Sequence, residues 1–301
     1  MDPLNILLIG GSGFVSGTLV RTARAAGHKV WTVTRGQRPL PDGVTPVIAD
    51  RRDRITFHNA IAQLPVQWDL VVDCIGYVVE DAQQDIELFR ERARHFVFIS
   101  TDFVYDPARR RFPQPEESEH YLVDGYGGQK RQCELAFLNG DTGSMAWTIV
   151  RPCHIYGPGS LLGCLPLHSR DAQLLTPLKA GQPLRLLGGG HFLQQPIFAQ
   201  DLAQTILSCA GNPNCHGQIY LTAGPDLIES REYYRIIAEI LGVNLQVEEV
   251  PLDEFLAANP DRHSFACHRI YELSKLRQHG LYVPATSITE GLRQQVASLL
   301  G

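Results

Sequence analysis

Short hydrophobic runs alternate with amphipathic stretches of helical character through the first half of the chain. The runs have the length and composition typical of buried strands, and they lie at residues 5–9, 29–34, 45–49, 70–74, 95–99 and 146–150. The first stretch between them follows Gly13 and is expected to end at Gly27, because glycine readily takes the left-handed conformation that stops a helix. Strands that alternate with helices in this way build a parallel sheet covered on both faces.

The second half of the chain is less regular. Proline and glycine become frequent in residues 152–196, where the alternation is lost. A strand at residues 218–222 is expected to return to the sheet, and a helix at residues 230–241 and a segment at residues 245–251 follow it. The pattern therefore predicts an α/β fold, with a Rossmann-type doubly wound parallel sheet and a smaller C-terminal lobe.

The length of 301 residues suffices for a main domain with a smaller lobe built around it. We predict a main domain at residues 1–151, to which residues 195–224 return. The lobe is expected to consist of residues 152–194 and 225–301.

Composition narrows the class of protein. A formal net charge of −5 at pH 7 argues against nucleic acid as a partner, and no apolar run is long enough to cross a membrane. The seven cysteines are scattered without a C-x-x-C pair, and the N-terminus does not resemble a signal peptide, so we expect a cytoplasmic protein. No metal site is predicted.

A glycine-rich turn occupies the first junction between a strand and a helix, at residues 7–17. Glycines permit a tight turn and a close approach of the backbone to a diphosphate, and the N-terminus of the following helix offers free N–H groups and a partial positive charge. We therefore predict that the main domain binds a dinucleotide. The residues of the turn expected to contact it are Gly10, Ser12, Gly13, Phe14 and Val15.

Arg35 and Arg38 follow the second predicted strand, where the adenosine ribose of a dinucleotide would lie. An acidic residue at this place would bind the ribose hydroxyls of NAD, whereas an arginine pairs with the 2′-phosphate of NADP. Because no acidic residue is present there, the sequence favours NADP over NAD as the cofactor.

Tyr126 and Lys130 form a Y-x-x-x-K motif, and side chains four residues apart lie on the same face of a helix. A lysine cation beside a phenol favours the phenolate, so Tyr126 is suited to exchange a proton with a substrate oxygen while hydride moves to or from a cofactor. Thr101 follows the fifth predicted strand and is expected to polarise the same oxygen. These three residues are the predicted catalytic group.

The motifs resemble those of the extended short-chain dehydrogenases/reductases, the NAD-dependent epimerase/dehydratase family. The turn resembles the family's G-x-x-G-x-x-G pattern with Ser16 at the third glycine position, and residues 151–159 and 195–202 resemble two further family segments. The resemblance implies a further set of cofactor contacts, namely Asp50, Cys74, Ile75, Gly76 and Pro152. It also implies that His154 faces a small-molecule substrate.

The residues that follow Thr101 differ between members of this family that catalyse different reactions. Its 4,6-dehydratases carry Thr-Asp-Glu, whereas Asp102 is followed here by Phe103, which is closer to the 4-keto reductases of nucleotide sugars. Nucleotide-sugar members hold the substrate diphosphate with two arginines; Gln194 stands at the first of these positions, and Arg262 fits the second. The candidate substrate contacts are therefore Asp102, His154, Gln194 and Arg262, unless Asp102 serves only as a cap for the following turn.

Three functions are compatible with these motifs. The first is a reductase or dehydrogenase that uses free NAD(P)(H), and the second is an epimerase or isomerase that retains NAD and returns the hydride to the other face of the substrate. The third is a non-catalytic dinucleotide- or RNA-binding member of the family, although such members usually lose the tyrosine or the lysine that this chain keeps. Helices that flank such sheets often pair, so a homodimer is also expected.

Overall fold

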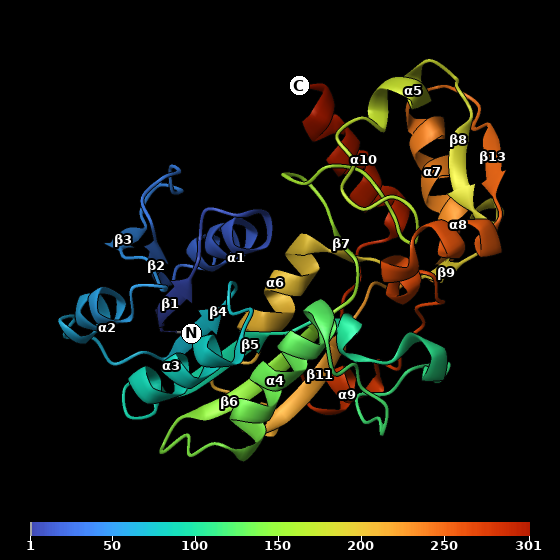
Figure 1. Ribbon diagram of the computed structural model, residues 1–301. Coiled ribbons are helices and arrows are strands. Elements are labelled where there is room, and N and C mark those ends of the chain that lie inside the picture. Colours follow the sequence, from blue (N-terminus) through green and yellow to red (C-terminus); the bar gives the residue numbers. More distant parts are fainter. Residues whose placement is uncertain (1) are drawn as a thin grey trace.

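A seven-stranded parallel sheet forms the centre of the protein (Figure 1). The computed structural model describes residues 2–301. The strands follow the order β11-β6-β5-β4-β1-β2-β3, and the order reverses between β1 and β4, which is the doubly wound topology expected from the sequence. The strands are β1 (Asn5–Ile9), β2 (Lys29–Thr34), β3 (Thr45–Ile48), β4 (Leu70–Asp73), β5 (His95–Ile99), β6 (Ala146–Pro152) and β11 (Gln218–Thr222).

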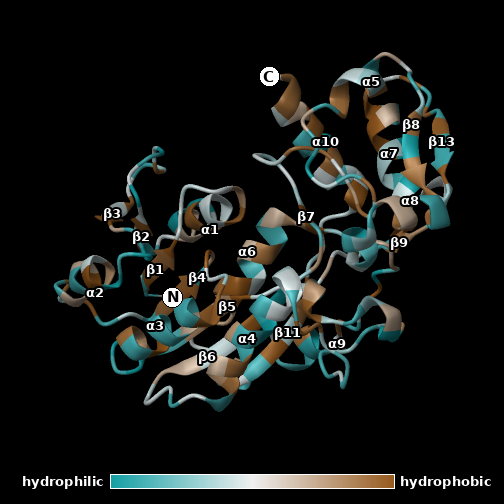
Figure 2. Ribbon diagram, in the orientation of Figure 1, coloured by the Kyte–Doolittle hydropathy of each residue, from teal (hydrophilic) through white to brown (hydrophobic). Residues whose placement is uncertain are grey.

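Helices cover both faces of this sheet, and each face has its own hydrophobic core. One face carries α1 (Phe14–Ala25) and α6 (Ala199–Leu207), and the other carries α2 (Arg54–Ala62), α3 (Val79–Phe89) and α4 (Gly125–Asn139). Leu7 and Leu8 are fully buried in different cores, because successive residues of a strand point to opposite faces. Figure 2 shows the central strands as largely hydrophobic, which explains why they form continuous apolar runs in the sequence.

The observed boundaries lie within two residues of the expected ones. Strand β6 continues to Pro152 because it pairs with β11 as far as Thr222. Helix α1 ends at Ala25, and Gly27 follows with a φ of +84° and donates its N–H to the carbonyl of Arg24. The glycine therefore stops the helix in the conformation that the sequence predicts.

A smaller lobe stands beside the sheet, at the upper right of Figure 1. Its helices are α5 (Leu175–Lys179), α7 (Ser230–Ile240), α8 (Leu252–Ala258) and α10 (Ile288–Leu300), and its main strand pair is β8 (Leu184–Leu187) with β13 (Val247–Val250). Two-residue strands form two further pairs, β7 (Ile155–Tyr156) with β10 (Ile197–Phe198) and β9 (Leu193–Gln194) with β12 (Ile228–Glu229). The buried Tyr233 and Tyr234 of α7 lie in a third core.

The exact boundaries of the main domain and the lobe stay a prediction, but packing shows that one segment of the C-terminal region contacts the main sheet. Tyr271, Leu276 and Leu281 belong to the core on the face of the sheet that carries α1 and α6, although the sequence assigns residues 225–301 to the lobe. Helix α9 (Ser274–Gln278) thus packs with the sheet. Within residues 2–301, none of the helices has both the length and the hydrophobicity required to span a membrane.

Candidate active site

The turn between β1 and α1 leaves room for a ligand directly against its backbone. Gly10 and Gly11 have φ values of +106° and +144°, which residues with a side chain rarely adopt. A Cβ atom on Gly11 would lie 2.7 Å from Cγ2 of Thr32, so only glycine fits. Ser16 is buried, and its hydroxyl accepts a hydrogen bond of 3.2 Å from the N–H of Gly13, which fixes the start of α1. This cradle fits the diphosphate of a dinucleotide.

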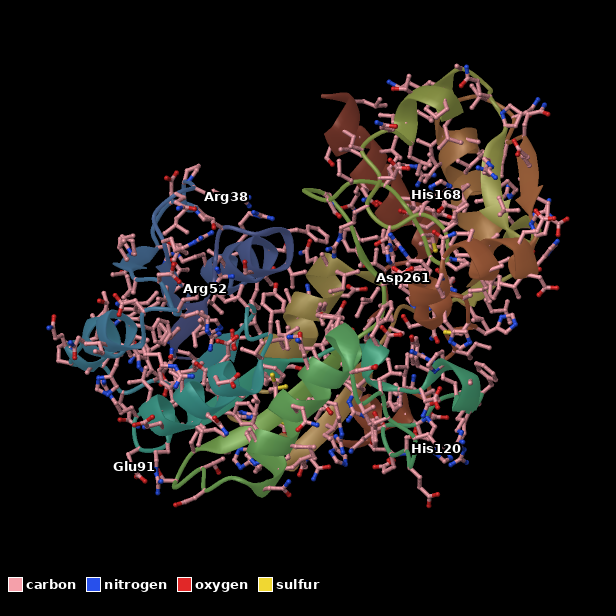
Figure 3. All side chains as sticks on the ribbon, in the orientation of Figure 1. Arg38, Arg52, Glu91, His120, His168 and Asp261 are labelled. Carbon is pink, nitrogen blue, oxygen red and sulfur yellow. The ribbon has the colours of Figure 1, made fainter. Side chains whose placement is uncertain are left out.

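A cavity of about 540 Å³, here the glycine-turn cavity, extends from this turn along the ends of β2 and β3. Arg35, Arg38 and Arg52 line it together with Asp50, whose carboxylate accepts a hydrogen bond of 3.0 Å from the main-chain N–H of Arg52. Figure 3 shows Arg38 and Arg52 on the side of the molecule that carries β1, β2 and α1. Three positive side chains therefore surround the end of β2.

A buried ionic cluster supports the loop after β4. The guanidinium of Arg51 lies 2.9 Å from Asp73 and 3.2 Å from both Asp81 and Asp85. Burial acts to raise the pKa of Asp73, but Arg51 lowers it below its ordinary value, whereas burial and the charge of Asp73 raise the pKa of Asp85 well above its ordinary value. Asp73 also accepts a hydrogen bond of 2.8 Å from the N–H of Ile75. The ionised Asp73 thus fixes the loop that lies between the two cavities.

A larger cavity of about 770 Å³, here the tyrosine cavity, lies where β5 and β6 end. Thr101, Tyr126 and Lys130 all line it, so the structure brings the three predicted catalytic residues into one wall. Tyr77, which the sequence did not single out, lines both cavities and places them next to each other.

The predicted cofactor contacts divide between the two cavities. Those in the wall of the glycine-turn cavity are Gly10, Ser12, Gly13, Arg35, Asp50 and Ile75. Those in the wall of the tyrosine cavity are Val15, Cys74 and Pro152. Phe14 and Gly76 line neither cavity, but the carbonyl of Gly76 accepts a hydrogen bond from Lys130.

Helix α4 presents Tyr126 and Lys130 one turn apart, as the motif predicts. Gly127 stands between them, and a Cβ atom there would collide with the main-chain carbonyl of Phe103, in the short helical turn that follows β5. The close contact with this carbonyl brings the helix against the loop that carries Thr101. The glycine after the tyrosine is therefore required by packing.

Lys130 is almost fully buried, although it belongs to the cavity wall. Its ammonium donates hydrogen bonds of 2.7 Å to the carbonyl of Gly76 and 2.6 Å to the carbonyl of Ile99. Burial lowers the pKa of Lys130, and the carboxylate of Asp73 acts in the opposite direction. Because an ammonium has three N–H donors, one remains for a ligand hydroxyl.

Tyr126 is half exposed at the cavity. Partial burial raises the pKa of Tyr126 to about 12, the nearby Tyr77 acts in the same direction, and a hydrogen bond with Thr101 opposes both. The phenol is therefore protonated at neutral pH and can donate its proton.

Of the predicted substrate contacts, His154 and Asp102 lie in the wall of this cavity. Burial, together with the charge of Arg170, lowers the pKa of His154 to about 4, so its ring is neutral at neutral pH. Its neutral ring can donate or accept a hydrogen bond but cannot act as a cation.

The Asp102 carboxylate is not free to bind a substrate. It accepts hydrogen bonds of 3.0 Å from Arg110, 3.1 Å from Arg269 and 2.6 Å from Tyr271, and the residue is 1% exposed. Burial acts to raise the pKa of Asp102, but Arg110 and Arg269 lower it. Asp102 therefore joins the loop after β5 to the C-terminal part of the chain.

The structure does not bring Gln194 and Arg262 to either cavity. Gln194 is fully buried, and its amide donates a hydrogen bond of 3.4 Å to the carbonyl of Cys267. The guanidinium of Arg262 lies over the ring of Phe265, 5.1 Å from its centroid. The paired arginines of a diphosphate clamp are thus absent from these walls.

The lobe supplies the opposite wall of the tyrosine cavity. Its contributions are Leu165, Ser169, Arg170 and every residue of the short segment Pro260–Phe265 except Arg262. Figure 3 shows Asp261 on the lobe side of the molecule, away from Arg38 and Arg52. Sequence reasoning missed these residues because they lie in irregular segments without a periodic pattern or a motif.

Comparison with known proteins agrees with this geometry. Residues 6–222 match the model of the NAD dependent epimerase/dehydratase family. The chain belongs to this family. Binding of NAD(P) is typical of NAD-dependent epimerase/dehydratase proteins, and the glycine cradle of this member fits such a ligand.

The curated relatives of this chain include a stem-loop binding protein as well as enzymes, as their names show. A chloroplast stem-loop binding protein of 41 kDa from Arabidopsis thaliana is 26% identical over 73% of this chain, and the match spans 58% of that protein. The UDP-glucose 4-epimerase of Vibrio cholerae is 25% identical over 78% of this chain and 75% of its own length. The 2′-dehydrokanamycin reductase of Streptomyces kanamyceticus is 26% identical over 84% of this chain and 71% of its own length.

Solved structures show the same fold. The UDP-glucose 4-epimerase of Thermotoga maritima, determined with UDP-glucose, superimposes with a TM-score of 0.81 at 16% identity and covers 99% of both chains. The UDP-N-acetylglucosamine 4-epimerase of Methanobrevibacter ruminantium also gives 0.81 at 16% identity, over 100% of this chain and 99% of its own. The whole chain therefore has the epimerase/dehydratase fold, lobe included.

Proposed function

We propose that this family member is an NAD(P)-dependent oxidoreductase that interconverts a carbonyl and a carbinol on a small-molecule substrate. The observation that carries the proposal is the placement of Thr101, Tyr126 and Lys130 in one cavity wall, next to the cavity of the glycine turn. A dinucleotide bound at that turn would supply or accept the hydride. The residues of the chain would hold the substrate and move the proton.

Reduction is the direction that the state of Tyr126 favours. Its pKa of about 12 keeps the phenol protonated, so it can give a proton to the substrate oxygen as that oxygen gains negative charge. The Thr101 hydroxyl donates a second hydrogen bond to the same oxygen. The positive charge of Arg170 acts to lower the pKa of Tyr126, and so lowers the cost of the phenolate that remains.

We further propose that the cofactor is NADP rather than NAD. Arg35, Arg38 and Arg52 line the glycine-turn cavity near the end of β2, and no acidic residue occupies positions 35–38 to bind a ribose diol. Guanidinium groups pair with phosphate oxygens through two parallel hydrogen bonds, which suits a 2′-phosphate.

The substrate we propose is a sugar-derived ketone or alcohol of the nucleotide-sugar type. A volume of about 770 Å³ accommodates a ligand of that size. The proposal agrees with the names of two relatives, an epimerase of UDP-glucose and a reductase of 2′-dehydrokanamycin. A substrate diphosphate, if present, must be held without Gln194, which is buried.

The test begins with purified protein, from which any retained dinucleotide is released by denaturation and quantified. A reductase is expected to carry little dinucleotide and to consume NADPH in proportion to product when offered 4-keto-6-deoxy nucleotide sugars or simpler sugar ketones. Tightly retained NAD without net consumption would instead support the epimerase alternative. Failure to bind either dinucleotide in calorimetry would overturn the proposal and favour a non-catalytic role.

A further inference from the structure

The connection between β7 and α5, here the crossing loop (residues 157–174), links the lobe to the glycine turn. In Figure 1 this yellow-green segment runs from the lobe toward α1. Gly159 passes against the ring of Phe14, since a Cβ atom there would lie 3.7 Å from Cδ2 of Phe14. The guanidinium carbon of Arg170 lies 5.4 Å from the centroid of the same ring. Two points of the loop therefore meet the first residue of α1.

Arg170 is held in a strained conformation. Its φ of +52° is the only positive φ of a residue other than glycine among residues 2–301. Such a conformation costs free energy and persists where the surroundings impose it, often at ligand sites. The strain therefore identifies Arg170 as a residue whose position is specified by the fold.

Neighbouring contacts impose that conformation from both sides. His168 bonds to the carbonyl of Arg185 at 2.9 Å and packs edge-on against the ring of Tyr234. On the other side, the N–H of Asp171 donates a hydrogen bond of 2.7 Å to the carbonyl of Leu162. The chain is thus held two residues before Arg170 and one residue after it, and the side chain of Arg170 joins the wall of the tyrosine cavity.

The guanidinium of Arg170 is a cation available to a ligand. Within residues 2–301 it makes no ion pair with a carboxylate, and it lines the tyrosine cavity together with Tyr126. The other lysine or arginine of that wall, Lys130, is already bound to two carbonyls. An anionic ligand that spans the junction of the cavities would therefore meet Arg170.

We propose that Arg170 binds a diphosphate at the junction of the glycine-turn and tyrosine cavities. The position over Phe14 favours this chemistry, because α1 begins there and the N-terminus of a helix already attracts phosphate. The diphosphate comes from the dinucleotide or from a nucleotide-sugar substrate. The inference rests on the proposed function, since both sources belong to it.

The proposal is tested with Arg170→Gly, Arg170→Lys and the control Arg293→Gln, which alters an exposed arginine of α10 paired with Glu290. Dissociation constants are measured by calorimetry, first for NADPH and then for UDP added to the NADPH-loaded protein. Loss of a charge-assisted hydrogen bond corresponds to about a tenfold to hundredfold weakening. Arg170→Lys is expected to lie between wild type and Arg170→Gly, because it keeps the charge but loses the planar fork.

Thermal unfolding without ligand separates binding from folding. Glycine adopts a φ of +52° without strain, so Arg170→Gly is expected to melt at or above the wild-type temperature while it binds more weakly. Weaker binding of NADPH would assign the diphosphate to the dinucleotide. Weaker binding of UDP alone would assign it to the substrate. Unchanged constants in both arms would overturn the role of Arg170, whereas a wild-type protein that binds neither dinucleotide would overturn the proposed function instead.

Discussion

At the scale of single residues, Tyr126 and Lys130 differ in exposure and therefore in the roles that each can have at the site. The phenol faces the cavity, whereas the ammonium is fixed behind it by two carbonyls. A motif of two residues predicts that they share a helix face, and the structure adds that only the tyrosine is placed to exchange a proton with a substrate. Proton transfer to the substrate should therefore depend on the phenolic oxygen of Tyr126.

Removal of that oxygen gives the first prediction. Tyr126→Phe is expected to lower the turnover number by at least about a hundredfold, because the general acid is lost. The dissociation constant for NADPH should remain within about twofold of wild type, because the ring and its packing are retained. Steady-state kinetics and fluorescence titration measure the two quantities. Full activity in this variant would show that another group donates the proton.

The arginines near the end of β2 give a second prediction at this scale. Arg35→Asp is expected to weaken NADPH binding about tenfold or more, because it removes a charge-assisted hydrogen bond to the 2′-phosphate and introduces repulsion. NADH lacks this phosphate, so its binding should change less. Titration of both dinucleotides against Arg35→Asp and the control Arg293→Gln checks the ratio. Equal weakening of the two would contradict the preference for NADP.

Residues that depend on distant partners could not be interpreted from the sequence. From the sequence, Asp102 is either a cap or a substrate contact. In the structure its carboxylate accepts hydrogen bonds from Arg269 and Tyr271, which lie 167 and 169 positions later. Arg51 likewise meets Asp73 and Asp85 only after the sheet has formed. Local motifs therefore suffice to propose Thr101, Tyr126 and Lys130 as the catalytic group, whereas the ionic clusters beside them require the tertiary structure.

At the scale of elements, the long strands were predictable and the short ones were not. Strands β4 and β5 are buried on both faces, so each contains an uninterrupted apolar run, at residues 70–72 and 96–99. The pairs β7 with β10 and β9 with β12 have two residues in each strand, which is too few to produce a recognisable pattern. These short pairs lie around the lobe, where the sequence offered only frequent proline and glycine.

Helix α4 supplies a prediction at this scale. Gly127→Ala should lower the free energy of unfolding by about 1–3 kcal/mol, because the new Cβ would overlap the carbonyl of Phe103 and force the helix away. Activity should fall as well, since Tyr126 moves with the helix. The matched control is Gln129→Ala, an exposed position of the same helix, for which chemical denaturation should show no loss of stability. Equal stability of both variants would disprove the packing role of Gly127.

At the scale of the whole molecule, both sheet faces and the lobe depend on side chains that join separate parts of the chain. Asp201 of α6 accepts hydrogen bonds from Tyr282, Ala285 and Thr286, and so fixes the segment that leads into α10. The sequence suggests a lobe after residue 225, but it does not reveal that residues 271–281 return to the sheet. Such a return depends on complementary surfaces, which hydrophobic periodicity does not encode.

A buried histidine in the main sheet makes the stability of the whole chain depend on pH. His95 of β5 is 2% exposed, and its ring bonds to the carbonyl of Cys209 and the hydroxyl of Thr148. Burial, with a contribution from His216, lowers the pKa of His95 from 6.5 to about 4. The unfolded chain therefore binds a proton at this residue between pH 6.5 and 4, where the folded protein does not.

Because the unfolded chain binds this extra proton, the folded state loses stability as the pH falls. Stability from the neutral His95 is fully present above pH 6.5 and is lost as the pH falls toward 4, by about 3 kcal/mol in all. Urea unfolding at several pH values between 7.5 and 4.5 measures the slope, and His95→Gln, which cannot titrate, should make it shallower even if the variant is less stable at every pH. An unchanged slope in His95→Gln would show that the acid sensitivity arises from other groups, among which His154, with a pKa of about 4, acts in the same direction.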